Sequence, residues 1–100
     1  MAKQIIWSLQ AQNDRKEILT YWFVRNKSNT YGKKLNLLIR KAIKLISLYP
    51  YIGFKTDVEN VKAKALRDYL IIYQVSEKRI EILSIWHSKR NPGDLIKQLH

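Results

Sequence analysis

The stretch that decides the fold reads YLIIYQV at residues 69–75, SEK at 76–78 and RIEILSIW at 79–86. The first run is almost uniformly apolar, which is typical of a central strand. In the third run apolar residues recur at every second position, and this alternation predicts a strand with Ile80 and Trp86 on the same side. The three polar residues between the two runs predict a hairpin that joins antiparallel strands.

The same periodicity predicts further strands on either side of this hairpin. VKAKAL at residues 61–66 alternates apolar with basic side chains, as in a half-buried strand that has one cationic face. KQIIW at residues 3–7 has an apolar centre and predicts a short strand. After the hairpin, NPG at residues 91–93 ends the last strand, and residues 94–99 have room for one or two helical turns.

Two amphipathic helices are predicted between the first strand and the later ones. Ser8 stands in the N-cap position of a helix over residues 9–26, where apolar side chains recur at three- and four-residue steps. Residues 30–48 carry a more regular apolar stripe and predict a second helix, which ends before Pro50. Because the polar turn between them is short, the helices should pack antiparallel as a hairpin.

Together these elements predict an α+β domain over residues 1–100, in the order β-α-α-β-β-β. An N-terminal strand and the helical hairpin precede a three-stranded antiparallel sheet, and a short helical tail follows it. The hairpin should cover one face of the sheet. The other face should be only partly covered, which leaves a basic concave surface built from the strands and the loop after the second helix.

Charge is the first indication of function. The chain carries 19 Lys and Arg against 8 Asp and Glu, a net charge of +11 on 100 residues. Such a balance favours a partner that is a polyanion or an acidic protein segment, although a merely basic surface would have the same composition. There is no cysteine, so disulfides and thiolate metal sites are excluded, and we expect neither a metal nor a cofactor.

The sequence also bears on the compartment. The opening MAKQIIWSLQ turns polar too soon for a secretory signal, and no apolar run approaches the roughly 20 residues that a membrane span requires. We therefore expect a cytoplasmic protein with no membrane partner.

Several segments, in this order and spacing, resemble the RelE/ParE superfamily of type II toxin–antitoxin toxins. They are IIWS at residues 5–8, LYPYIG at 48–53, YLIIYQV at 69–75 and IEILSIWHSKRNPGDL at 80–95. The resemblance implies a microbial-RNase-like fold and a cognate antitoxin that blocks the active surface, with operator DNA contacted only through that antitoxin. RelE-like members enter the ribosome and cleave mRNA there, whereas ParE-like members inhibit DNA gyrase.

The residues also allow a test of ribonuclease chemistry. Metal-free RNA cleavage needs a base, an acid and cations that stabilise the charge on the phosphorane. His87 titrates near neutrality, and a guanidinium can bind a phosphate with two donors. The catalytic candidates are therefore Arg67, His87 and Arg90, and the candidates for nucleic-acid binding are Lys62, Lys64 and Lys89.

Each candidate also has a structural explanation. His87 stands before a charged tail and can equally be an ordinary surface residue. Lys62 and Lys64 can be the solvated face of an edge strand. Arg67 can pair with Asp68 or with an antitoxin carboxylate. Two aromatic residues, Trp86 and Tyr73, could stack on bases, but their positions in apolar strands favour the core.

One position departs from the ribonuclease pattern. RelE-like ribonucleases usually carry an arginine directly before the central "LVY" of the strand, whereas this chain has Leu70 there, as in ParE-like chains. The net charge favours the ribosome instead. We therefore expect a ribosome-dependent mRNA endonuclease, which would be metal-independent. The alternatives are a DNA gyrase inhibitor without catalytic activity and a degenerate member that only binds its antitoxin.

Overall fold

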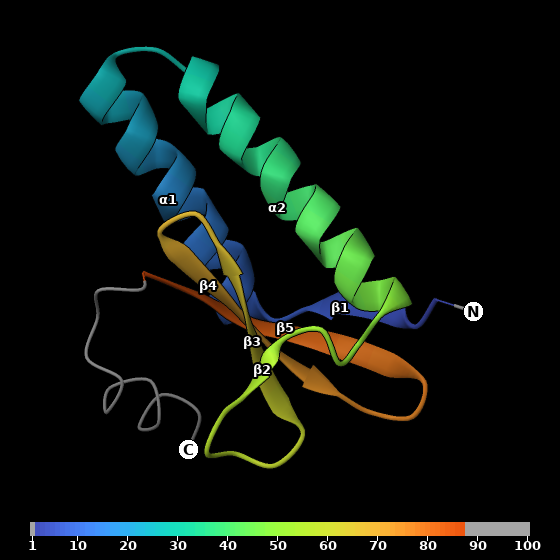
Figure 1. Ribbon diagram of the computed structural model, residues 1–100. Coiled ribbons are helices and arrows are strands. Elements are labelled where there is room, and N and C mark those ends of the chain that lie inside the picture. Colours follow the sequence, from blue (N-terminus) through green and yellow to red (C-terminus); the bar gives the residue numbers. More distant parts are fainter. Residues whose placement is uncertain (1, 88–100) are drawn as a thin grey trace.

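The computed structural model describes residues 2–87, and these form two helices packed on one face of a five-stranded sheet (Figure 1). The elements, in chain order, are β1 (Gln4–Trp7), α1 (Leu9–Asn26), α2 (Thr30–Leu48), β2 (Phe54–Lys55), β3 (Val61–Leu66), β4 (Tyr69–Val75) and β5 (Arg79–His87). The order predicted from the sequence is confirmed. The predicted helical tail at residues 94–99 lies outside the described residues.

The sheet is mixed, with the strand order β1-β5-β4-β3-β2. The predicted three-stranded antiparallel sheet is its centre, since β3 pairs with β4 and β4 pairs with β5. Two features go beyond the prediction. β1 joins the same sheet parallel to β5, so the first and last described strands lie side by side (Figure 1). β2 adds an edge strand of only two residues, too short to have a detectable period.

The main core lies between the helices and the sheet. α2 supplies its regular stripe, with Leu35, Ile39 and Ile46 almost fully buried. The sheet contributes Ile71 and Tyr73 from β4, and both have no exposed surface. Burial of such side chains stabilises the fold by about 1.5–3 kcal/mol each. The helical stripe read from the sequence is therefore the face that holds the hairpin on the sheet.

A β-bulge in β5 corrects one expectation. The alternation predicts Ile80 and Trp86 on one side, but the register shifts between Ile72 and Tyr73, so that Ile72 pairs with Ser84 and Tyr73 with Ile82. An extra residue in one strand turns the side chains after it to the opposite face. Ile80 consequently packs in the main core under the helices, whereas Trp86 packs with Ile72 in a smaller core on the other face.

Candidate functional site

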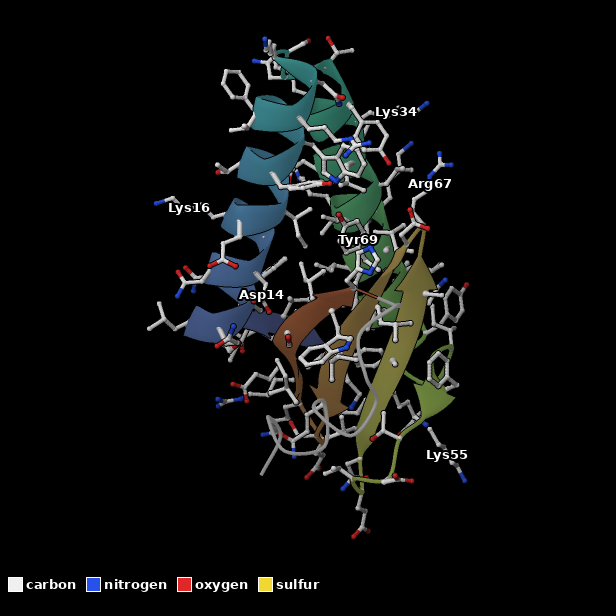
Figure 2. The ribbon with its side chains drawn as sticks, turned by 90° about the vertical axis from the view of Figure 1, so that its left-hand side faces the viewer. Asp14, Lys16, Lys34, Lys55, Arg67 and Tyr69 are labelled. Carbon is white, nitrogen blue, oxygen red and sulfur yellow. The ribbon has the colours of Figure 1, made fainter. Side chains whose placement is uncertain are left out.

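Arg67 lies in the tight turn between β3 and β4, not in a strand. Its φ of 56° is in the left-handed region, which a two-residue hairpin turn requires. The residue is exposed at the tip of the hairpin, away from the sheet (Figure 2). This position lies between the strands predicted at residues 61–66 and 69–75. Asp68 is the second residue of the same turn.

His87 is the last residue of β5 and lies directly opposite Tyr69 on β4. The two rings meet edge to face, with centroids 5.5 Å apart and planes at 84°. Both line a groove of about 580 Å³ between α1 and the ends of β4 and β5. We name it the His87 groove.

The charges around this groove are mainly negative. Asp14 and Glu17 of α1 and Asp68 of the turn line it, against the single cation Arg25 among the lining residues that the structure describes. Like charges repel one another, so the described lining residues make the groove unfavourable for an anion such as a scissile phosphate.

The floor of the groove is aromatic and its phenol stays protonated at neutral pH. The indole Nε1 of Trp22 donates to the hydroxyl of Tyr69 at 2.9 Å. Burial raises the pKa of Tyr69, an effect that outweighs the lowering by this hydrogen bond. Tyr69 is thus a structural member of the groove wall and no base at neutral pH.

Asp14 has a structural role at the mouth of the groove. Its Oδ2 accepts from the backbone amide of Ile85 at 3.0 Å and from the hydroxyl of Ser84 at 2.7 Å. β1 ends at Trp7, opposite Ile82, so the edge of β5 beyond that point has no neighbouring strand. The carboxylate of Asp14 takes the place of a strand there, as Figure 2 shows at the foot of α1.

The two lysines of β3 lie elsewhere. Lys62 and Lys64 are opposite Tyr73 and Ile71, residues of the main core, so their side chains lie on the face that the helices cover, at its outer edge. The basic surface is therefore at the β3 edge, not on the open face as predicted. Lys64 donates to the carbonyl of Ala65 at 3.2 Å.

Two exposed residues that the sequence analysis did not single out, Lys55 and Tyr51, lie next to Lys62 at this edge. We call Tyr51, Lys55, Lys62 and Lys64 the strip at the β3 edge. Lys55 pairs directly opposite Lys62, and the Nζ of Lys62 lies 5.4 Å from the centroid of the Tyr51 ring. Like charges directly opposite on a sheet are destabilising. No periodic signal marks the two-residue strand that brings Lys55 there.

The structure therefore brings some candidates together and separates others. Arg67 and His87 lie at the same end of the sheet, on either side of Tyr69, but the His87 groove is lined by neither Lys62 nor Lys64. Arg90 and Lys89 lie outside the described residues. Tyr73 and Trp86 are buried, as their positions predicted, at 0% and 5% exposure.

Within residues 2–87, no group of three or more His, Cys, Asp or Glu side chains is arranged to hold a metal ion. Neither α1 nor α2 is long and apolar enough to span a membrane.

Known structures share this architecture. One, of the chromosomal ParDE toxin–antitoxin system from P. aeruginosa, superimposes with a TM-score of 0.77 at 20% identity over 88% of this chain and 98% of that one. Another, of the YoeB dimer from Staphylococcus aureus, gives a TM-score of 0.62 at 20% identity over 87% and 98%. No curated protein matches the sequence. At these identities the likeness concerns the fold, which is that of the RelE/ParE class of toxins.

The sequence itself shows which family within this class the chain belongs to. Residues 5–92 match the family model of the ParE toxin of the type II toxin–antitoxin system parDE, so the chain belongs to this family. The match covers β1 through the end of β5 and therefore includes every element of the fold.

Proposed function

We propose that this toxin arrests growth by binding and inhibiting DNA gyrase, without cleaving nucleic acid itself. The observation that supports the proposal most is the His87 groove, whose described lining combines His87 with the carboxylates of Asp14, Glu17 and Asp68. Among the described candidates for phosphate binding, Lys62 and Lys64 on β3 and Arg67 at the hairpin tip do not line this groove. Membership of the ParE family supports the same mechanism.

The partner that neutralises the toxin is a cognate antitoxin. The P. aeruginosa structure is described as a toxin–antitoxin system, which supports such a partner for this chain. The net charge of +11 and exposed apolar side chains, among them Leu9, Val24 and Tyr51, favour a segment that carries acidic and apolar residues. Operator DNA is contacted through the antitoxin, and the complex acts in the cytoplasm, where gyrase and ribosomes are.

The test compares the two mechanisms with one protein preparation. Purified toxin is added to a gyrase supercoiling reaction and, separately, to translating ribosomes whose mRNA is mapped by primer extension. We expect loss of supercoiling, restored by the antitoxin, and intact mRNA at excess toxin. Cleavage at A-site codons together with undisturbed supercoiling would overturn the proposal. Absence of growth arrest on expression of the chain alone would instead indicate the degenerate member.

A substitution of His87 separates the two mechanisms most clearly. His87→Phe keeps a ring against Tyr69 while removing the titratable group, so we expect full growth arrest, measured as colony-forming units after induction. In a ribonuclease that uses His87, the same change would lower the cleavage rate by roughly 100-fold or more. Circular dichroism of the purified variant checks that it folds, and Arg67→Gln is a second variant for which the same outcome is expected.

The ribosome-dependent endonuclease remains a second candidate because of the strip at the β3 edge. Lys55 lies opposite Lys62, Lys64 follows on β3, and Lys62 lies beside the exposed ring of Tyr51, a combination that suits a nucleic-acid backbone and a stacked base. Arg67, His87 and Arg90 would then be its catalytic residues, with Lys89 as a further contact. Its specific prediction is that Lys62→Ala abolishes mRNA cleavage on the ribosome but leaves antitoxin binding intact.

A further inference from the structure

The His87 groove has a wall of aromatic rings for which neither mechanism of growth arrest has a use. Tyr21 and Trp22 of α1 meet edge to face, with ring centroids 5.1 Å apart, and Tyr69 and His87 meet in the same way at the end of the sheet. The hydrogen bond from the Trp22 indole to the Tyr69 hydroxyl joins the two pairs. All four rings line the groove, whose volume of about 580 Å³ is enough for a small organic molecule.

A cation of the chain itself already lies on this wall. The guanidinium of Arg25 lies 5.9 Å from the centroid of the Trp22 ring and donates to the Tyr21 hydroxyl at 3.3 Å. The faces of aromatic rings are electron-rich, so a cation within about 6 Å of a ring centroid is attracted to it. Arg25 is exposed in the last turn of α1, and a cation from solution would compete with it for the same rings.

The carboxylates of the groove come from two separate places. On one side Asp14 of α1 is fixed beside Ile85, whose backbone amide donates to it. On the other side Asp68 lies in the turn directly before Tyr69, the residue that pairs with His87. His87 follows Ile85 by two residues, which is about 7 Å along a strand. The groove therefore offers two positions for positive charge, with rings between α1 and the sheet.

Two of the carboxylates are accessible to a ligand. Glu17 and Asp68 are exposed, and among residues 2–87 no group forms a hydrogen bond or an ion pair with either carboxylate. In a chain of net charge +11, three carboxylates facing a single described arginine are a local reversal of charge. The groove can therefore attract a cation that the rest of the surface repels.

These features select the chemistry of the ligand. A phosphate or a nucleotide would be repelled by the carboxylates, and an uncharged molecule would leave them unused. A metal ion would leave the rings unused, and the described residues hold no cluster arranged to bind one. A linear aliphatic diamine can place an ammonium group at each position, while its methylene groups lie on the rings.

We propose that the His87 groove is a binding site for a linear aliphatic diamine or polyamine. One ammonium group pairs with Glu17 on the α1 side, and the other pairs with Asp68. The methylene groups between them lie on the rings of Trp22 and Tyr69. This site goes beyond the proposed function and does not depend on whether the toxin acts on gyrase or on mRNA.

The experiment follows the indole N–H signal of Trp22 by NMR of the isotope-labelled full chain, at constant ionic strength. Putrescine is the probe, and butylamine and butanediol are compounds of the same carbon chain with one charge and with none. We expect a saturable shift with putrescine and none with butanediol. The dissociation constant of butylamine should be roughly three- to tenfold higher than that of putrescine, because it forms one ion pair fewer.

Three variants test the groups that bind the ligand. Glu17→Gln with Asp68→Asn removes the two exposed carboxylates and should raise the dissociation constant of putrescine roughly three- to tenfold. Asp57→Asn with Glu59→Gln is the matched control, since it changes the net charge equally at exposed positions that do not line the groove. Arg25→Gln removes the competing cation and should lower the dissociation constant roughly two- to fivefold.

The outcomes decide the proposal. Weaker binding by the carboxylate variant and tighter binding by Arg25→Gln, with the control close to wild type, support it. The absence of a saturable shift at Trp22 in the wild-type protein overturns it, as does equal affinity for putrescine and butylamine. Equal weakening in the carboxylate variant and in the control would show that net charge alone attracts the diamine, which also overturns it. Near-UV circular dichroism confirms that each variant is folded.

Discussion

At the scale of single residues, Asp14 shows how one side chain completes a sheet. Its carboxylate accepts from an amide and a hydroxyl of β5 and, through Oδ1, from the side chain of Gln10 at 2.8 Å. Charge-assisted hydrogen bonds of this kind are about twice as strong as neutral ones. Asp14 was not among the sequence candidates, because the residues that it contacts lie about 70 positions later in the chain.

Removing this carboxylate should therefore destabilise the fold. We expect Asp14→Ala to lower the free energy of unfolding by about 2–3 kcal/mol, since the buried amide of Ile85 and the hydroxyl of Ser84 lose their acceptor. Urea denaturation followed by tryptophan fluorescence measures the change. Glu17→Ala, one turn further along α1 and exposed, should stay within about 0.5 kcal/mol of wild type. Equal effects of the two substitutions would contradict the role given to Asp14.

Two buried phenols make the fold sensitive to alkali. Burial raises the pKa of Tyr69 and of Tyr73 above the usual 10.0, and the smaller opposing effects are hydrogen bonds from the indole of Trp22 and the amide of Gly53 respectively. A raised pKa in the folded state means that the neutral form is favoured there. The stabilisation is fully present below pH 10 and is lost as the pH rises through the folded values.

We expect the free energy of unfolding to fall more steeply above pH 10 in the wild-type protein than in Tyr73→Phe. The comparison isolates one phenol, because the lysines titrate alike in both proteins. At neutral pH the same variant should be less stable by about 1–3 kcal/mol, since the Tyr73 hydroxyl accepts from Gly53 at 3.0 Å and donates to the carbonyl of Pro50 at 2.8 Å. Parallel pH profiles of the two proteins would contradict the alkaline effect.

At the scale of elements, the start of α1 is fixed twice by Ser8. Its hydroxyl accepts from the amide of Ala11 at 3.0 Å, as the predicted N-cap requires, and also donates to the carbonyl of Leu83 in the bulge of β5 at 2.9 Å. The cap therefore sets both the first turn of the helix and its position on the sheet. The second bond could not be read from the sequence, because the bulge has no sequence mark.

Ser8→Ala should cost about 1–2 kcal/mol of unfolding free energy, at the upper end of the range for N-caps. Ser8→Asp restores an acceptor for the helix but has no hydrogen to donate to Leu83. We therefore expect Ser8→Asp to recover only part of the loss, as measured by thermal unfolding. Full recovery would mean that the hydrogen bond to Leu83 adds nothing to the stability of the fold.

The elements also show how much of the fold can be predicted from the sequence. Both helices and strands β3, β4 and β5 could be predicted from local apolar patterns, although the bulge in β5 puts Ile80 and Trp86 on opposite faces. Local periodicity does not determine which strands are neighbours, so the place of β1 beside β5 could not be predicted. The candidate site was harder to predict for the same reason, because the His87 groove combines Asp14 and Trp22 of α1 with Asp68 of a turn. No spacing in the sequence records that arrangement.

At the scale of the whole molecule, the net charge of +11 lowers the stability of the free protein, and binding of an acidic partner would neutralise part of it. Uncompensated charge repels itself and destabilises the compact state, and salt screens the repulsion over a Debye length of about 10 Å at 0.1 M. Part of this charge is concentrated at one surface between β1, α1 and α2, where Arg15, Arg40, Lys41 and Lys44 lie with no described carboxylate among the lining residues. The free toxin and its complexes should consequently respond to salt in opposite ways.

We expect the midpoint of thermal unfolding of the free toxin to rise with NaCl between about 0.05 and 0.5 M, as screening increases. Over the same range its affinity for an acidic partner should fall. Differential scanning calorimetry and titration calorimetry measure the two trends, and sucrose at equal osmolality serves as the uncharged control. An affinity that does not change with salt would show that charge contributes little to recognition.

The pairing of β1 with β5 also determines when the sheet can be completed during synthesis. Gln4 pairs with Arg79 and Trp7 with Ile82, so the opening strand has no partner until almost all of the described chain has been made. Chains grow at roughly 5–20 residues per second, and the helical hairpin can form from local contacts well before then. An interval of several seconds therefore passes in which the helical hairpin can form while the sheet is still incomplete.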